Sequence, residues 1–209
     1  ILSKYGVHVP FFFAAALSFV NAVVLYFILP ESLTPEKRAE APKRKNRFLE
    51  IFESFAHKEF REINIVYFLL VTSFSIMTYA FVLYTAFRFG FTAEQNGFLF
   101  AFIGIIAIVA QGVLFNRLVQ KFGESTLVVA GCLMMVASLF LVPIVGPGYG
   151  GLTVLLLGTA LLAFGNSLAS PGLTSLASKT ASEKDQGRTL GIMQSGASLA
   201  RVIGPVLGG

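Results

Sequence analysis

The feature that most limits the fold of this chain is a series of long stretches without any Asp, Glu, Lys or Arg. They cover residues 5–30, 63–87, 95–116, 125–178 and 189–200. A transmembrane helix needs about 20 mainly apolar residues to cross a hydrocarbon core about 30 Å thick. The first three stretches, of 26, 25 and 22 residues, therefore each have the length of one membrane crossing.

The fourth stretch, of 54 residues, is too long for one helix. It is interrupted by Pro143 and by the glycine-rich run 146–151, which is a turn signal. We therefore read it as two helices joined by a short uncharged loop. The sequence predicts six spans, at residues 8–30, 63–87, 95–116, 125–145, 151–173 and 188–209.

Composition excludes the soluble alternatives. Charged residues make up 13% of the chain, whereas a soluble domain carries about 25%. None of the apolar runs alternates in polarity as the strands of a membrane β-barrel do, and the first run is longer than the apolar region of a signal peptide. The predicted fold is an all-α, polytopic membrane helix bundle.

The residues offer no set for catalysis. Cys132 is the single cysteine, so a disulfide or a cysteine metal cluster cannot form within the chain. The spans hold no Ser/His/Asp or Cys/His arrangement and no phosphate-binding glycine loop. We expect no enzyme activity, no catalytic residue, no metal site and no cofactor.

Basic residues predict the orientation of the chain, because short loops rich in Lys and Arg stay in the cytoplasm. Segments 31–62, 117–124 and 179–188 hold 13 of the 16 basic residues. We expect a multi-pass protein of the cell inner (plasma) membrane, with the N-terminus outside and the 31–62 linker cytoplasmic.

The linker has two readings. Phe48, Ile51, Phe52 and Phe55 would share one face of a helix, which predicts either a helix lying on the inner membrane surface or a solvated connector whose aromatic rings pack on neighbouring helices. The basic run 43–47 favours anionic membrane lipid, and not nucleic acid, as a partner.

Small residues recur at helical spacing and predict close helix contacts, because lipid offers no hydrophobic drive for helix association. Simple bundle packing and surfaces that rock during transport both fit this pattern. The expected packing residues are Gly158, Gly165, Gly191, Gly204, Pro205 and Gly209.

Three motifs together resemble a known family. A charged linker follows the Pro-Glu-Ser-Leu exit at 30–33, Gly112 to Lys121 resembles a degenerate cytoplasmic signature, and Gly204 to Gly209 resembles a Gly-Pro-x-x-x-Gly element. These are similar to features of major facilitator superfamily transporters, in particular the tetracycline-efflux-like drug–proton antiporters. Asn116 stands where the signature has Asp, and Val119 replaces its inner Gly.

The resemblance implies a fragment covering helices six to eleven of a twelve-helix fold. Residues 1–30 would be the last helix of the N-terminal half, 31–62 the linker between halves, and 63–209 a truncated C-terminal half. The implied cytoplasmic gate motif comprises Gly112, Asn116, Arg117 and Lys121, for which plain positive-inside anchoring is the alternative.

The resemblance also implies which spans line a central cavity. The cavity candidates come from three spans: Thr72, Ser75 and Tyr79 from the second, Asn166 and Ser170 from the fifth, and Gln194, Ser198 and Arg201 from the sixth. The face of the first group continues to Leu83, and Pro171 follows the second group. Uncharged polar residues in membrane helices also join helices together, so that reading stays open. Arg201 either faces the cavity or a partner, or reaches the outer interface.

The implied function is secondary active transport, specifically efflux of amphipathic small molecules or drugs by proton antiport with alternating access. No span holds an acid, so the proton-coupling residues are expected in the missing half. We expect a small-molecule substrate, protons and membrane lipid as partners, and a monomer as the functional unit. A carrier for a sugar or another metabolite, or a non-transporting receptor or structural bundle, is the alternative.

Overall fold

The computed structural model describes residues 5–6, 8–28, 58–148, 150–182 and 185–209. The chain divides into two compact units, residues 1–47 and 48–209, and each is described by itself. Most of the linker, including the predicted helical face from Phe48 to Phe55, the 30–33 motif and the basic run 43–47, lies outside the described residues.

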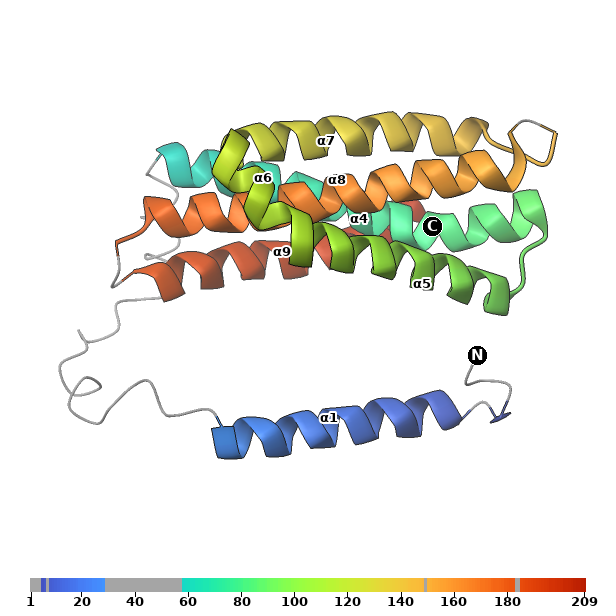
Figure 1. Cartoon of the computed structure of the whole chain (residues 1–209), viewed down its shortest axis with the longest axis horizontal. Coiled ribbons are helices and arrows are strands. Elements are labelled where there is room, and N and C mark those ends of the chain that lie inside the picture. Colours follow the sequence, from blue (N-terminus) through green and yellow to red (C-terminus); the bar gives the residue numbers. More distant parts are fainter. Residues whose placement is uncertain (1–4, 7, 29–57, 149, 183–184) are drawn as a thin grey trace. The chain divides into compact units, whose positions relative to one another are not determined.

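The predicted all-α membrane bundle is confirmed. The described residues form helices and no β-strand, and six helical segments are long and apolar enough to cross a membrane. The first unit contains α1 (Val9–Ile28), which has no buried residue within its own unit. The second unit contains α4 (Lys58–Phe89), α5 (Ala93–Val109), the π-helix η2 (Ala110–Leu114), α6 (Phe115–Phe122), α7 (Glu124–Leu141), the 3₁₀ helix η3 (Val142–Ile144), α8 (Gly151–Thr180) and α9 (Gln186–Gly208) (Figure 1).

Three helical segments extend well beyond the predicted spans: α4, α8, and the continuous α5–η2–α6 segment, which covers Ala93–Phe122 where residues 95–116 were predicted. The α4 helix begins at Lys58 and not at residue 63, and its first turn carries a Lys58–Glu62 ion pair of 3.8 Å at i,i+4 spacing. The α8 helix continues to Thr180, past the predicted end at residue 173, and Pro171 lies inside it. Additional turns can prolong a helix beyond its predicted span: the first turn of α4 is charged, whereas residues 174–178 of α8 carry no charge.

The junction between α4 and α5 is specified locally. Gly90 has a φ of +66°, a conformation that side chains with a Cβ rarely adopt, and it follows the last residue of α4. Thr92 then caps α5: its hydroxyl accepts from the Gln95 N–H, and the Gln95 side chain accepts from the Thr92 N–H. The chain therefore reverses within three residues.

The α8 helix is the centre of the second unit. It lies beside α7 along most of its length and also contacts α4, α5, η2 and α9, while α4 pairs with α9 (Figure 1). The α7–α8 contact depends on glycine. A Cβ at Gly131 would lie 2.5 Å from the Gly165 carbonyl oxygen, and a Cβ at Gly165 would lie 2.6 Å from the Gly131 carbonyl oxygen. Only two residues without side chains allow this backbone approach.

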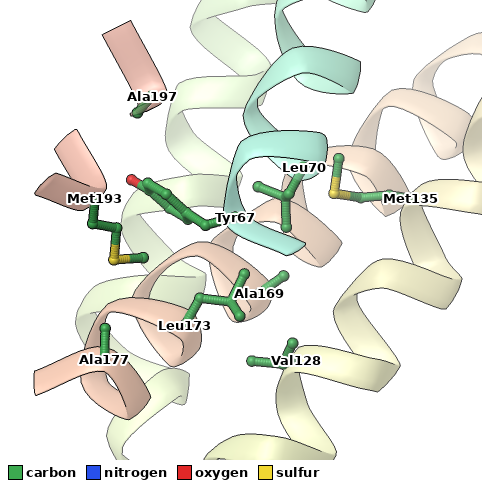
Figure 2. Close-up of a cluster of buried hydrophobic side chains, with 9 residues drawn as sticks. All are labelled: Tyr67, Leu70, Val128, Met135, Ala169, Leu173, Ala177, Met193 and Ala197. Atoms are coloured by element: carbon green, nitrogen blue, oxygen red, sulfur yellow. The ribbon is translucent and has the colours of Figure 1, made fainter. Parts of the chain in front are cut away.

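Two apolar clusters fill the unit. One joins four helices: Tyr67 and Leu70 on α4 meet side chains of α7, α8 and α9 (Figure 2). Its other members are Val128, Met135, Ala169, Leu173, Ala177, Met193 and Ala197. The second cluster lies around Phe81 and Leu155, and its other members are Met77, Leu99, Val142, Val145 and Leu162. Together these clusters fix the positions of α4, α5 and α9, which form the candidate site.

We predict that Gly165→Ala destabilises the full-length protein. The added methyl group would meet backbone, which cannot rotate away, and overpacking of this kind costs about 1–3 kcal/mol. The melting temperature in detergent should fall. Gly97→Ala is the matched control, because a Cβ at Gly97 meets nothing within 4 Å among the described residues. Equal melting temperatures for the two variants would contradict the close α7–α8 contact.

Candidate functional site

A groove of about 460 Å³ opens between α4, α5 and α9. Most of its wall comes from one face of α4, and one residue each comes from α5 and α9. The lining residues are Ser75, Thr78, Tyr79, Val82, Leu83, Phe100 and Pro205. Of the described cavities, this groove is the one that residues of the predicted polar face of α4 line.

Glycine brings α9 against this wall. A Cβ at Gly204 would lie 2.5 Å from both Cβ and Oγ of Ser75 and 3.1 Å from the Ile76 nitrogen. The α9 helix can therefore approach α4 at this level only through an unsubstituted Cα. The next residue, Pro205, is consequently held at the edge of the groove.

The lining is aromatic and apolar, with a few hydroxyl groups. Tyr79 is 47% exposed, Leu83 55% and Phe100 36%, so large side chains stand open in the groove. The Thr78 hydroxyl donates to the Phe74 carbonyl at 2.8 Å and is already partnered. Among the described residues, no charged side chain lines the groove. A mainly apolar site with a small number of polar groups suits an amphipathic organic molecule.

The structure brings together only part of the predicted cavity set. Ser75 and Tyr79 line the groove, and Pro205, predicted as a packing residue, lines it too. Thr72 lies outside it and donates to the Phe68 carbonyl at 2.8 Å. The remaining candidates lie elsewhere on their helices: Asn166 and Ser170 are half-buried on α8, and Gln194, Ser198 and Arg201 are exposed on α9.

Thr78, Val82 and Phe100 are groove residues that the sequence reasoning missed. Thr78 and Val82 flank the i,i+4 row of Ser75, Tyr79 and Leu83, so a wider stripe of the α4 face would have included them. Phe100 belongs to α5, and its position depends on how two helices pack. No local signal in the sequence identifies it.

The sequence matches the Major Facilitator Superfamily over residues 1–205. The chain belongs to this superfamily.

Two bacterial resistance proteins are among the relatives of this chain. It is 32% identical to Multidrug resistance protein 2 of Bacillus subtilis (strain 168), over 100% of the chain and 51% of that protein. It is 26% identical to the class D tetracycline resistance protein of Salmonella ordonez, over 96% of the chain and 49% of that protein. The chain thus spans about half the length of the curated relatives it matches.

A solved structure shares the fold. The crystal structure of the human organic anion transporter MFSD10 (TETRAN) superposes with a TM-score of 0.79 at 27% identity. The match covers 96% of this chain and 50% of that chain. This chain therefore shares its fold with the matched half of MFSD10.

The predicted gate motif lies where the α5–α6 segment changes its winding. Gly112 is in the π-helix η2, and Asn116, Arg117 and Lys121 follow in α6, where all three are exposed. The Lys121 ammonium group lies 5.2 Å from the centroid of the Phe122 ring. The π turn was not predicted, since the sequence there reads as a continuous apolar helix.

A cluster next to this motif was also missed. Glu124, at the start of α7, forms an ion pair with Lys179 near the end of α8, and the Ser175 hydroxyl donates to the same carboxylate at 3.2 Å. The Glu124 side chain is 15% exposed and that of Lys179 is 63% exposed. Because the pair is open to solvent on one side, it links the start of α7 to the end of α8 but contributes little to stability.

At the other end of the bundle, buried hydrogen bonds join the helices. The Thr85 hydroxyl on α4 donates to the Asn96 Oδ1 on α5 at 2.6 Å. The Ser138 hydroxyl on α7 donates to the Gly158 carbonyl on α8 at 2.7 Å, and the Tyr84 hydroxyl donates to the Val145 carbonyl. The Thr85 and Tyr84 bonds hold the end of the α4 wall in place, because buried polar groups are costly to leave unpaired.

The predicted packing residues differ in what surrounds them. A Cβ at Gly158 would lie 3.1 Å from Val142 Cγ2, and one at Gly209 would lie 2.9 Å from Tyr79 Cε1. Gly165 and Gly204 make the backbone contacts described above. Gly191 differs: a Cβ there meets nothing within 4 Å among the described residues.

A second cavity, of about 410 Å³, lies on the opposite face of α4. Its wall is apolar except for Ser73 and Tyr84, and the Tyr84 hydroxyl is already bonded to Val145. The other lining residues are Ile76, Met77, Ala80, Phe81, Leu139, Val142 and Pro143. Its surface offers little to orient a polar ligand.

We predict that Thr85→Val lowers the free energy of unfolding by about 1–3 kcal/mol, because it leaves the buried Asn96 oxygen without its donor from α4. Thr72→Val is the control. Both threonine hydroxyls lie within hydrogen-bond distance of a carbonyl four residues earlier in α4, but only the Thr85 hydroxyl also lies within hydrogen-bond distance of another helix, at Asn96 Oδ1. Thermal unfolding of the full-length protein in detergent checks this, and similar melting temperatures for the two variants would count against the α4–α5 bond.

Proposed function

We propose that this chain is part of a secondary active transporter that exports amphipathic small molecules, drugs among them, by proton antiport with alternating access. Residues 63–209 would supply five helices of one half of the transporter, residues 1–30 the last helix of the other half, and residues 31–62 the connection. The observation that carries the proposal is the groove between α4, α5 and α9 in a chain of this superfamily.

The character of the groove supports an amphipathic substrate. Tyr79, Leu83 and Phe100 offer large, exposed, weakly polar surfaces, and the Ser75 hydroxyl adds a polar contact. Such walls accept many apolar shapes because burial of apolar area does not depend on direction. The names of the relatives, multidrug resistance and tetracycline resistance proteins, fit a substrate of this kind.

Proton coupling requires a group that titrates inside the membrane, and membrane proton relays use Asp, Glu or His. Within the described part of the second unit, carboxylates occur only in the first two turns of a helix or just before one: Glu59, Glu62, Glu94, Glu124 and Asp185. We therefore assign the coupling residue to a part of the transporter outside the groove wall described here.

The proposed orientation places the linker in the cytoplasm. The α6 helix carries Arg117 and Lys121 and the end of α8 carries Lys179, whereas the last turn of α4, at the other end of the bundle, carries Arg88. This asymmetry matches the positive-inside rule if the first group faces the cytoplasm of a cell inner membrane. Arg117 and Lys121 would then act at the cytoplasmic gate, and the monomer would suffice for transport.

We predict that Phe100→Ala and Tyr79→Ala raise the accumulation of the neutral fluorescent amphiphile N-phenyl-1-naphthylamine in cells that express the full-length protein. Each change removes aromatic area from the groove wall, and loss of one buried ring weakens binding by about 2–3 kcal/mol at most. Cell fluorescence at steady state, with and without a protonophore, measures export.

Phe98→Ala is the control, because Phe98 is 52% exposed on α5 but does not line the groove. It should leave accumulation at the wild-type level. Unchanged accumulation in both groove variants would show that the groove is not on the transport path. Export that persists in the presence of the protonophore would rule out proton antiport.

A further inference from the structure

Exposed apolar side chains of α5 and η2 lead directly to exposed basic side chains of α6. Ile105, Val109 and Val113 follow one another every four residues, and they are 61%, 47% and 50% exposed. Arg117 and Lys121 continue the same spacing in α6, where both are exposed. We call these five residues the α5–α6 row. It has an apolar part and a cationic end.

The winding of η2 keeps the α5–α6 row on one side of the helix. Four residues of an α-helix leave a net rotation of about 40°, so an unbroken α-helix would place Lys121 about 160° around from Ile105. The π turn removes about 100° of this rotation, because it accommodates one extra residue. The whole row therefore lies within a sector of about 60°.

The length of the row matches one leaflet of a bilayer. Twelve residues separate Ile105 from Arg117, which corresponds to about 18 Å of helix. The hydrocarbon core is about 30 Å thick, so one leaflet contributes about half of this. When Ile105 lies near the midplane, the cationic end of the row therefore reaches the level of the lipid phosphates.

The two cations are available to a ligand. Within the described part of the chain, neither Arg117 nor Lys121 forms an ion pair. The nearby Glu124 carboxylate is already held by Lys179 and by the Ser175 hydroxyl. Long basic side chains can lay their stems along apolar surface while their charged groups stay in the polar layer. The cationic end of the row thus needs an anion from outside the described helices.

We propose that Arg117 and Lys121 bind the phosphate of one anionic membrane lipid of the phosphatidylglycerol type, whose acyl chain lies along Val113 and Val109. This inference goes beyond the proposed function, because it requires a bilayer and no transported solute. The guanidinium group offers paired N–H donors to the phosphate oxygens. The ammonium group adds a second positive charge about 6 Å further along the helix. A phosphatidylcholine headgroup carries the same phosphate, but both basic groups repel its choline cation.

Two photoactivatable lipids with the same diazirine-bearing acyl chain test the site. One has a phosphatidylglycerol headgroup and the other a phosphatidylcholine headgroup. Each is added at low mole fraction to phosphatidylcholine nanodiscs that contain the full-length protein, and peptide mass spectrometry measures the labelling of residues 105–122. The phosphatidylglycerol probe should label this segment about tenfold or more strongly than the phosphatidylcholine probe, since each basic residue near an anionic headgroup contributes about a fivefold preference.

Paired substitutions test which residues select the lipid. Arg117→Gln combined with Lys121→Gln should bring the labelling ratio close to one. Arg117→Lys combined with Lys121→Arg should keep most of the preference, because both charges remain. Lys58→Gln combined with Arg61→Gln is the matched control: it removes two exposed positive charges from the start of α4 and should leave the ratio unchanged. Because all of these side chains are exposed, the melting temperatures in detergent should stay close to that of the wild type.

Four outcomes would each overturn the lipid site. A wild-type ratio near one would show that this face does not select an anionic lipid. A ratio that survives the double Gln substitution in α6 would place the selection on other residues. Equal loss of the ratio in the α4 control would show a general effect of charge. Loss of labelling on addition of glycerol 3-phosphate, which lacks acyl chains, would assign the two cations to a soluble phosphate.

The dye-export measurements described above are independent of this labelling. Failure of the lipid site would therefore leave the proposed transport function unchanged. Conversely, unchanged export in the groove variants would leave the lipid site standing.

Discussion

Contact between two backbones is the interaction on which the second unit depends. Helices in a hydrocarbon solvent gain little from hiding apolar side chains, so they associate where dispersion contacts can be close and numerous. Gly131 and Gly165 provide this on α7 and α8, where each carbonyl oxygen lies where the other residue's Cβ would be. With α7 held along it, α8 becomes a rigid central rod against which α4, α5 and α9 find their positions.

The same rule produces the groove. Gly204 lets α9 reach Ser75 and Ile76 on α4, while the next residue, Pro205, and the ring of Phe100 on α5 stay at the edge of an open space. The close contact between α9 and α4 at Gly204 thus lies directly beside the open groove that Pro205 lines. The buried Thr85–Asn96 bond then keeps α4 and α5 at a fixed separation near the end of the groove wall. Packing and polar pairing therefore act on one element, α4, from different sides.

Much of the architecture could be predicted because the membrane imposes simple local requirements. The six spans follow from the lack of charge, and Ser75 and Tyr79 follow from the polar spacing on α4. What could not be predicted depends on partners distant in sequence. Phe100 enters the groove through the α4–α5 crossing, and Glu124 meets Lys179 only because α7 and α8 run side by side. The start of α4 was placed too late because a charged turn can precede the apolar region, and the end of α8 was placed too early because uncharged turns continue the helix past Pro171.

The π turn at Ala110–Leu114 changes the phase of the helix that contains it. The Phe115 N–H bonds to the Ala110 carbonyl, five residues earlier, so one extra residue is accommodated before α6 begins. Each residue of an α-helix advances by about 100°. Asn116, Arg117 and Lys121 consequently point about a quarter turn away from the directions that an unbroken continuation of α5 would give them. The directions of the basic side chains in α6 are therefore independent of the direction of Phe100 in α5. Each end of the span can pack against its own neighbours.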